Sequence, residues 1–241
     1  RDTVFSDNFQ TNMGWLAISG ADTGNWQRAI PSGSGDQCDP TTDVSGSGFC
    51  FLTGNNFHED VDNGSTMLYS PSITVDMDKA PTVSYYRWYS NGSNCGGANA
   101  NEDAMFIEIT LDNGNTFTSL ETVGPEGEDA QGGWRFVEFN LLDYFDEVGE
   151  LEMRLLFTVA DEMDPSIIEA GVDNVIFTNA FCGEPTPCFL ADVNKDGGVG
   201  VTDLLMVIDQ WGTDGIADIN GDGTVNVSDL LAVVDAWGPC T

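Results

Sequence analysis

Histidine, basic side chains and long apolar segments are scarce in this chain of 241 residues. His58 is the only histidine, so a histidine-rich metal site is excluded and a Ser-His-Asp triad would depend on this one residue. Seven Lys and Arg stand against 40 Asp and Glu, which gives a formal net charge of −33 at pH 7. A field of this sign repels polyanions, so we expect no nucleic acid partner. Because no segment is apolar over the roughly 20 residues that a transmembrane helix needs, we also expect no membrane insertion.

The usual signatures of catalysis are missing as well. The sequence contains no Gly-x-Ser-x-Gly, no His-Glu-x-x-His and no phosphate-cradling glycine motif. Nothing singles out two of the 40 acidic residues as the carboxylate pair of a glycosidase. We therefore predict that the chain is not an enzyme, and a small hydrolase that uses His58 is the least favoured hypothesis.

Six cysteines are present, and none belongs to a Cys-x-x-Cys pair of the kind that binds zinc. Structural disulfides are the better interpretation, and they predict secretion into an oxidising, extracellular compartment. The pairs considered are Cys38 with Cys50, Cys95 with Cys182, and Cys188 with Cys240. Spacing leaves the pairing open, since six cysteines allow 15 connectivities.

Short apolar runs alternate with turns over most of the chain, which contains 28 glycines and 9 prolines. One strand places Met105, Ile107 and Ile109 on a single face, and residues 112–115, Asp-Asn-Gly-Asn, then supply a hairpin turn. Further strands are expected at 26–30, 49–52, 67–75, 82–89, 116–123, 151–159 and 172–178. With roughly nine or ten strands and no helical periodicity, residues 1–181 are predicted to form a jelly-roll β-sandwich. The fold class is therefore mostly β.

The strand pattern ends at residues 182–190, because Pro185 and Pro187 suit neither a strand nor a helix interior. We place a linker here. Residues 191–241 then form a second, small domain.

This second domain contains an internal repeat. Residues 192–212 and 218–238 share 13 identities in 21 aligned positions, and both copies begin Asp-x-Asn-x-Asp-Gly. Oxygen-bearing side chains at loop positions 1, 3 and 5 and a glycine at 6 match the calcium loop of an EF-hand. The predicted ligands are Asp192, Asn194, Asp196, Gly198 through its carbonyl, and Asp203 in the first loop, and Asp218, Asn220, Asp222, Thr224 and Asp229 in the second. We therefore predict two calcium ions.

Each loop is expected to lead into a helix, with Thr202 and Ser228 as N-caps and a Trp-Gly pair at the end. Val199 and Val225, at loop position 8, are expected to join the two loops by a short β contact. A small core is expected between the helices. Its members would be Leu204, Leu205, Val207 and Ile208 against Leu230, Leu231, Val233 and Val234.

Two Asp-x-Asn-x-Asp-Gly loops, each followed by only one helix, resemble the type I dockerin family. The resemblance implies calcium-dependent folding and docking onto a cohesin domain. It also implies that the helix residues at loop positions 10 and 11 contact the partner, which are Val201, Thr202, Val227 and Ser228. The Trp-Gly endings and the flanking cysteines are similar to dockerin-like tails of secreted environmental bacterial proteins. A tail that anchors, caps or docks within its own chain is therefore the alternative.

The segments 7–9, 24–26, 60–64, 84–91, 106–113 and 169–175 resemble the MAM-like jelly-roll domains that follow catalytic domains in secreted bacterial peptidases. The resemblance implies an accessory module without chemistry of its own. It also implies structural calcium between the first and last strands, where Asp7 and Asp173 are the matching carboxylates. Asp60, Asp62 and Asp161 are further candidates, and solvated loop acids are the alternative interpretation.

These observations together predict a non-catalytic C-terminal accessory region of a secreted bacterial hydrolase, namely a protease, that binds calcium and serves attachment, docking or stability. The alternative is a carbohydrate-binding module with a dockerin tail that places it in a polysaccharide-degrading complex. Tyr85, Tyr86, Trp88 and Tyr89 could then stack on sugar rings, although adjacent strand aromatics more often belong to the core.

Overall fold

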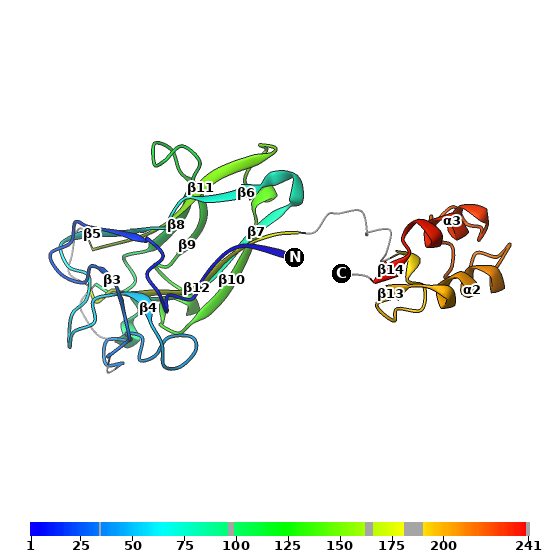
Figure 1. Ribbon diagram of the computed structural model, residues 1–241. Coiled ribbons are helices and arrows are strands. Elements are labelled where there is room, and N and C mark those ends of the chain that lie inside the picture. Colours follow the sequence, from blue (N-terminus) through cyan, green and yellow to red (C-terminus); the bar gives the residue numbers. More distant parts are fainter. Residues whose placement is uncertain (34, 96–98, 162–165, 181–189, 240–241) are drawn as a thin grey trace. The chain divides into compact units, whose positions relative to one another are not determined.

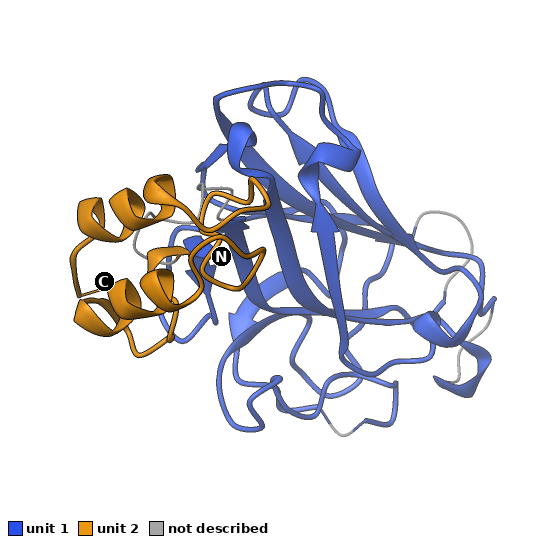
Figure 2. Ribbon diagram, turned by 90° about the vertical axis from the view of Figure 1, so that its right-hand side faces the viewer, with its two compact units in different colours: residues 1–181 blue, residues 182–241 orange. Residues whose placement is uncertain are grey.

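The computed structural model describes residues 1–33, 35–95, 99–161, 166–180 and 190–239 (Figure 1). The chain divides into two compact units, which Figure 2 colours separately. Unit 1 is Arg1–Phe181 and unit 2 is Cys182–Thr241. No helix within the described ranges is long and apolar enough to cross a membrane.

Unit 1 is built from short antiparallel strands, as predicted. They are β1 (Asp2–Asp7), β2 (Leu16–Ser19), β3 (Trp26–Ala29), β4 (Cys50–Thr53), β5 (Gly64–Tyr69), β6 (Ile73–Asp76), β7 (Pro81–Ser90), β8 (Met105–Thr110), β9 (Thr118–Val123), β10 (Arg135–Asn140), β11 (Glu150–Asp161) and β12 (Glu169–Asn179). Short 3-10 helices η1 (Met77–Lys79), η2 (Ser93–Cys95), η3 (Glu128–Ala130) and η4 (Leu141–Asp143) lie between them. The single strand expected at 67–75 is two strands, because Pro71 lies between β5 and β6 and cannot donate a ladder hydrogen bond.

The strands form two sheets that stack as a sandwich, which confirms the predicted fold class (Figure 1). Sheet A has the order β10-β7-β12-β4-β3, with β1 also paired to β12. Sheet B has the order β2-β5-β11-β8-β9, with β6 also paired to β11. Neighbours in each sheet are mostly distant in sequence, so the sandwich depends on long-range pairing.

The central strand of each sheet changes its neighbour partway along. Strand β12 pairs with β4 at Gly171 and Val172 and then with β1 from Val175 onward, across a bulge that begins at Asp173. Strand β11 pairs with β6 up to Met153 and with β5 from Leu156 onward. At both places an edge of the central strand is left open to loops and side chains.

The predicted alternation defines the core between the sheets. Met105, Ile107 and Ile109 on β8 are fully buried, as the period-2 pattern requires. Phe157 on β11 lies at the centre, with its ring 5.2 Å from that of Tyr85 in an edge-to-face arrangement. Complete burial of one such side chain contributes about 1.5–3 kcal/mol.

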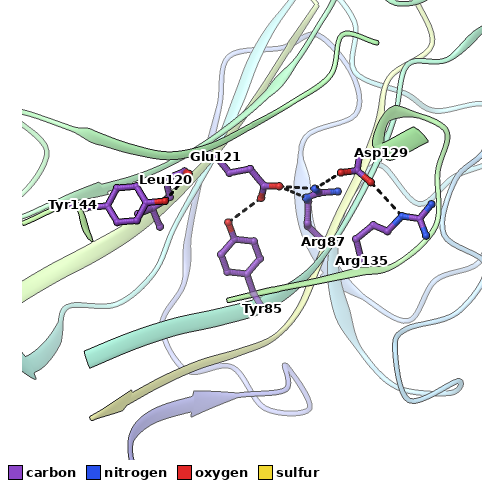
Figure 3. A network of polar contacts seen from close by, with 7 residues as sticks. All are labelled: Tyr85, Arg87, Leu120, Glu121, Asp129, Arg135 and Tyr144. Atoms are coloured by element: carbon purple, nitrogen blue, oxygen red, sulfur yellow. Dashed lines mark hydrogen bonds and ion pairs between the residues drawn. The ribbon is translucent and has the colours of Figure 1, made fainter. Parts of the chain in front are cut away.

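A buried arginine joins the two sheets (Figure 3). Arg87 on β7 of sheet A is only 3% exposed, and its Nε donates to Glu121 Oε1 of β9 in sheet B at 3.0 Å. Its Nη2 donates to the same oxygen and, at 3.0 Å, to Asp129 Oδ2. The Tyr85 hydroxyl donates to Glu121 Oε2 at 3.3 Å, and Arg135 pairs with the exposed Asp129. The network therefore fixes the position of one sheet relative to the other.

One disulfide is present among the described residues, between Cys38 and Cys95. The expected pairs Cys38–Cys50 and Cys95–Cys182 are therefore wrong, and Cys50 is a buried free thiol. The partners are 57 residues apart, and the fold rather than the spacing brings them together. Closing a loop of this length contributes roughly 4 kcal/mol in the chain-entropy model. Cys182, Cys188 and Cys240 lie outside the described residues.

Unit 2 consists of two loop-helix repeats with helices α2 (Val201–Asp209) and α3 (Val227–Asp235), and two short strands, β13 (Gly198–Val199) and β14 (Gly238–Pro239). The expected contact between Val199 and Val225 is wrong. Val199 instead pairs with Gly238, which follows α3, and Val225 exchanges hydrogen bonds with Gly212 and Thr213, which follow α2. Each loop thus pairs with the end of the other repeat, so the two repeats hold each other in place.

The expected core of unit 2 is correct only in part. Val207 and Val233 are buried, together with Ala191, Val193, Val199, Ala217, Ile219 and Val225. Leu205, Ile208, Leu231 and Val234 are 51–58% exposed, so their assignment to the core is wrong. Each helix carries apolar residues on two faces, and only one face is needed to cover the two loops.

Candidate functional sites

The first candidate calcium loop is a compact turn around its own carboxylates. Asp192 Oδ1 accepts from the backbone N–H of Asp196 at 3.1 Å, and its Oδ2 accepts from Gly197 N–H at 2.9 Å. Asn194 Oδ1 accepts from the same Asp196 N–H at 2.8 Å, and Asp196 Oδ1 accepts from Gly198 N–H at 3.1 Å. Oxygens at positions 1, 3 and 5 thus line the inside of one tight loop.

The second loop repeats this arrangement residue for residue. Asp218 accepts from Asp222 N–H at 3.2 Å and from Gly223 N–H at 2.8 Å. Asn220 accepts from Asp222 N–H, and Asp222 accepts from Thr224 N–H, both at 2.9 Å. The two loops, which are similar in sequence, therefore have the same local structure.

The aspartates at position 12 close both loops. Asp203 and Asp229 are at most 1% exposed. Asp229 Oδ1 accepts from Ile219 N–H at 2.8 Å, and its Oδ2 accepts from Asn226 N–H at 2.8 Å. Burial alone would raise the pKa of Asp229, but these backbone donors outweigh burial, so the pKa is lowered and the carboxylate stays charged.

The helix starts differ from the prediction by two residues. The N-caps are Gly200 and Asn226 rather than Thr202 and Ser228. Asp203 Oδ2 accepts from Gly200 N–H at 2.9 Å, in the same way that Asp229 accepts from Asn226 N–H. The position-12 carboxylate therefore accepts the hydrogen bond of the N-cap N–H. The hydroxyls of Thr202 and Ser228 lie on the exposed surface instead.

The donor set of each loop suits a hard cation. It offers carboxylate, amide and backbone oxygens only, as calcium requires. Within the described ranges, however, no three His, Cys, Asp or Glu side chains are gathered closely enough to hold a metal, because the loop carboxylates point to backbone N–H groups. Calcium would compete for these same oxygens, so ligation by the ten predicted residues stays a prediction.

Both helices expose an apolar row to solvent. The rows follow the spacing i, i+4, i+7 and consist of Val201, Leu205 and Ile208 on α2 and of Val227, Leu231 and Val234 on α3. All six side chains are 51–61% exposed. The four predicted partner-binding positions, 201, 202, 227 and 228, lie at the first turn of these rows and are exposed. The row residues farther along were missed, although the i, i+4, i+7 spacing alone could have found them.

Two loop-helix repeats and outward apolar rows invite comparison with known families. Residues 190–236 match the dockerin type I domain. Dockerin domains bind calcium, so the family supports calcium binding by unit 2. No curated protein matches the chain.

The β-sandwich of unit 1 resembles two solved structures. The K1 cleaved adhesin domain of Lys-gingipain from Porphyromonas gingivalis W83 is 14% identical, with 73% of this chain and 97% of that chain covered and a TM-score of 0.43. A family 11 carbohydrate-binding module from Clostridium thermocellum, in complex with a β-1,3-1,4-mixed-linked tetrasaccharide, is 16% identical over 74% of this chain and 95% of that chain, with a TM-score of 0.40. Identities this low describe fold alone, and the MAM-like resemblance stays a prediction.

In unit 1, the candidate ligands Asp7 and Asp173 lie where β12 exchanges β4 for β1. Both are buried, and the equally buried Asp43 lies within electrostatic range of Asp173. Burial raises the pKa of Asp173 to about 6, and the charges of Asp43 and Asp7 add to the shift. Asp43 was missed because it lies in an irregular loop without a motif. Calcium here remains a prediction, since Asp7 is also satisfied by Phe9 N–H and Trp15 Nε1–H.

A second acidic cluster surrounds Asp60. Burial raises the pKa of Asp60 to about 6, with the Asp62 charge as the next cause. Glu169 and the sole histidine, His58, line a neighbouring cavity of about 20 Å³. His58 stacks on Phe57, and no hydrogen bond joins it to a serine or carboxylate within the described part of the chain. A triad built on His58 therefore has no support in this geometry.

Replacing Glu169 by glutamine is expected to stabilise unit 1 at neutral pH. Glu169 is 2% exposed and, among the described residues, accepts a single hydrogen bond, from Thr53 Oγ1 at 3.4 Å. Burial, followed by the charges of Asp39 and Asp60, raises its pKa well above the ordinary value. A raised folded-state pKa means that stability is greatest below the unfolded pKa and falls as pH rises. Glu169→Gln should therefore gain about 1–3 kcal/mol at pH 7 and little at pH 4, measured by thermal unfolding in EDTA.

Glu59→Gln is the matched control, because Glu59 lines the same cavity but accepts several hydrogen bonds. Its carboxylate accepts from the backbone N–H groups of Asn55 and Asn56 and from Asn56 Nδ2–H. These donors outweigh burial and lower its pKa, so this variant should lose stability at pH 7. Equal changes in stability for Glu169→Gln and Glu59→Gln would contradict the conclusion that the buried charge of Glu169 destabilises unit 1.

The aromatic residues proposed as a sugar platform do not form one surface. Tyr85 and Tyr89 are fully buried in the core. Trp88 and Trp134 contact each other, and their indole N–H groups donate to the carbonyls of Cys38 and Thr42 in the loop beside them. These rings therefore serve the packing of unit 1.

Proposed function

We propose that this chain is a non-catalytic, secreted accessory polypeptide whose dockerin domain binds two calcium ions and docks the β-sandwich onto a cohesin-like protein partner. The observation that carries the proposal is the pair of exposed apolar rows on α2 and α3. Six large apolar side chains in two parallel patterns are costly to leave in water, and such patches mark protein interfaces. Helix faces of this kind bind grooves or flat apolar surfaces through anchors at i, i+4 and i+7.

Calcium and docking are linked in this proposal. Both rows begin directly after a predicted calcium loop, and the position-12 aspartate of that loop accepts a hydrogen bond from the N–H of the N-cap residue. Metal binding would therefore set the start and direction of both helices. Docking should accordingly require calcium.

The proposal includes export from the cell and an accessory role beside a hydrolase. The Cys38–Cys95 disulfide supports an oxidising compartment. The sequence prediction that the hydrolase is a protease has no further support from the fold.

Docking is expected to fail when both apolar rows are interrupted. Leu205→Glu with Leu231→Glu places a charge at the centre of each row, where both side chains are more than half exposed and the fold should tolerate the change. Affinity for a type I cohesin, measured by surface plasmon resonance with calcium, should fall at least about tenfold. The wild-type chain should lose binding in EDTA.

Val148→Glu is the control, because Val148 is a 77% exposed apolar residue of unit 1 and belongs to neither row. It should bind like the wild type. Undiminished binding by the double variant would show that the partner uses another surface.

A second candidate function is polysaccharide binding by unit 1, which would make the chain a carbohydrate-binding module with a dockerin tail. The outer face of sheet B favours it. Leu16, Ile18 and Phe106 are 41–52% exposed on this face, although they lie on regular strands. A flat apolar sheet surface suits the apolar faces of sugar rings.

A further inference from the structure

A groove crosses the outer face of sheet B where β11 exchanges β6 for β5. Two adjoining hollows of about 240 and 430 Å³ share Asn113 and Arg154. The first is lined by Leu16, Ile18 and Tyr69, and the second by polar residues that include Ser72 and Glu152. The groove therefore has one apolar half and one polar half.

Tyr69 forms the floor of the apolar half. Leu16 of β2 pairs directly with Tyr69, and Leu156 of β11 pairs with it on the other side. The Tyr69 hydroxyl reaches Met67 Sδ at 4.0 Å, two residues back along the same strand. The hydroxyl end of the ring therefore points back along its own strand.

The polar half contains unused hydrogen-bond donors. Arg154 makes no ion pair within the described residues, and its one hydrogen bond is a 3.5 Å contact to the Ser70 carbonyl. The Asn113 side chain has no hydrogen bond to another described residue. The nearby Asp112 is already saturated, since its carboxylate accepts from Thr110, Asn115 and Thr116. The groove thus offers a guanidinium with one long hydrogen bond, and an amide without a hydrogen bond among the described residues, beside an aromatic ring.

We propose that this groove binds a neutral polysaccharide chain, with a sugar ring on Tyr69 and hydroxyl groups hydrogen-bonded to Arg154 and Asn113. The inference rests on the second candidate function and names its site. The charge of the chain decides the ligand class, because a net charge of −33 repels polyanions. A purely apolar partner would leave the donors of Arg154 and Asn113 unsatisfied. Neutral hydroxyl-bearing rings match both halves of the groove.

Affinity electrophoresis of the full chain tests the proposal. Native gels would contain hydroxyethyl cellulose, xyloglucan, arabinoxylan or galactomannan, with polygalacturonate as the polyanion. We expect retardation by at least one neutral polymer and none by polygalacturonate. Tyr69→Ala and Arg154→Gln should weaken binding to that polymer at least about tenfold. Thermal unfolding of each variant checks its fold, and Leu16→Ser, at a 52% exposed position, repeats the test without loss of buried contacts.

Phe136→Ala is the matched control, since Phe136 is an exposed aromatic residue of sheet A, at 56%. It should bind like the wild type. Retardation that survives Tyr69→Ala but not Phe136→Ala would overturn the groove and leave polysaccharide binding by unit 1 standing. No retardation by any neutral polymer would overturn both. Equal retardation by polygalacturonate would overturn the neutral class, and mobility that changes with protein concentration would identify a second copy of the chain as the occupant instead.

Discussion

Asp192→Ala combined with Asp218→Ala is expected to unfold the dockerin domain in calcium and to leave the β-sandwich folded. Each aspartate occupies loop position 1 and accepts two backbone hydrogen bonds that shape its loop. A unit of about 50 residues buries too little surface to be stable alone, so the free energy of metal binding becomes free energy of folding. Loss of both ligands should therefore remove most of the stability of unit 2.

Circular dichroism and calcium calorimetry on the full chain would measure this outcome. The helical signal of α2 and α3 should disappear, together with two high-affinity calcium sites, and EDTA should have the same effect on the wild type. Asp214→Ala is the control, because Asp214 lies between the two loops and outside both ligand sets. Unchanged helix content and calcium uptake in the double variant would refute the assignment of these loops as calcium sites.

Glu121→Gln is expected to destabilise the β-sandwich by about 3 kcal/mol. Glu121 faces Arg87 from the opposite sheet and receives hydrogen bonds from Arg87 Nε and Nη2 and from Tyr85 (Figure 3). Arg87 Nη1 already lacks a hydrogen-bond partner in the described structure, so no further acceptor is available to replace Glu121. Without the charge of Glu121, the buried guanidinium of Arg87 keeps only one carboxylate partner, the exposed Asp129. Chemical denaturation of unit 1 within the full chain would show a lower midpoint.

Asp129→Asn is the matched control for this prediction. Asp129 contacts the same Nη2 at 3.0 Å, but its side chain is 55% exposed and screened by water. Its loss should cost less than about 1 kcal/mol. If the two variants were equally destabilised, burial would not be the reason for the strength of the Arg87–Glu121 pair.

The presence of two loop-helix repeats could be predicted from sequence because the loop pattern is local. Positions 1, 3, 5 and 6 of each loop lie within six residues, and Asp203 and Asp229 follow at a fixed distance. The predicted N-caps were wrong by two residues for an equally local reason. A carboxylate three residues into the helix satisfied the N-cap N–H, so the hydroxyls of Thr202 and Ser228 were not needed there.

The outward faces of α2 and α3 were harder to predict, because every position from 204 to 208 is apolar. A pattern with two apolar faces does not tell which face is covered. Packing against Ala191, Ile219 and the loop valines selected the face of Val207 and Val233, and this left Leu205 and Leu231 exposed. The proposed docking surface is the face that the core did not use.

By itself the sequence determined the mostly β class of unit 1, the two-repeat dockerin domain and the residues of its loops, since period-2 alternation and loop spacing act between near neighbours. Only the tertiary structure decided which cysteines pair, which acids lie together and where a groove forms. Cys38 with Cys95, Asp7 with Asp173, and Tyr69 with Arg154 come from different strands or loops. Their proximity follows from the order of strands in two sheets, which no local pattern encodes.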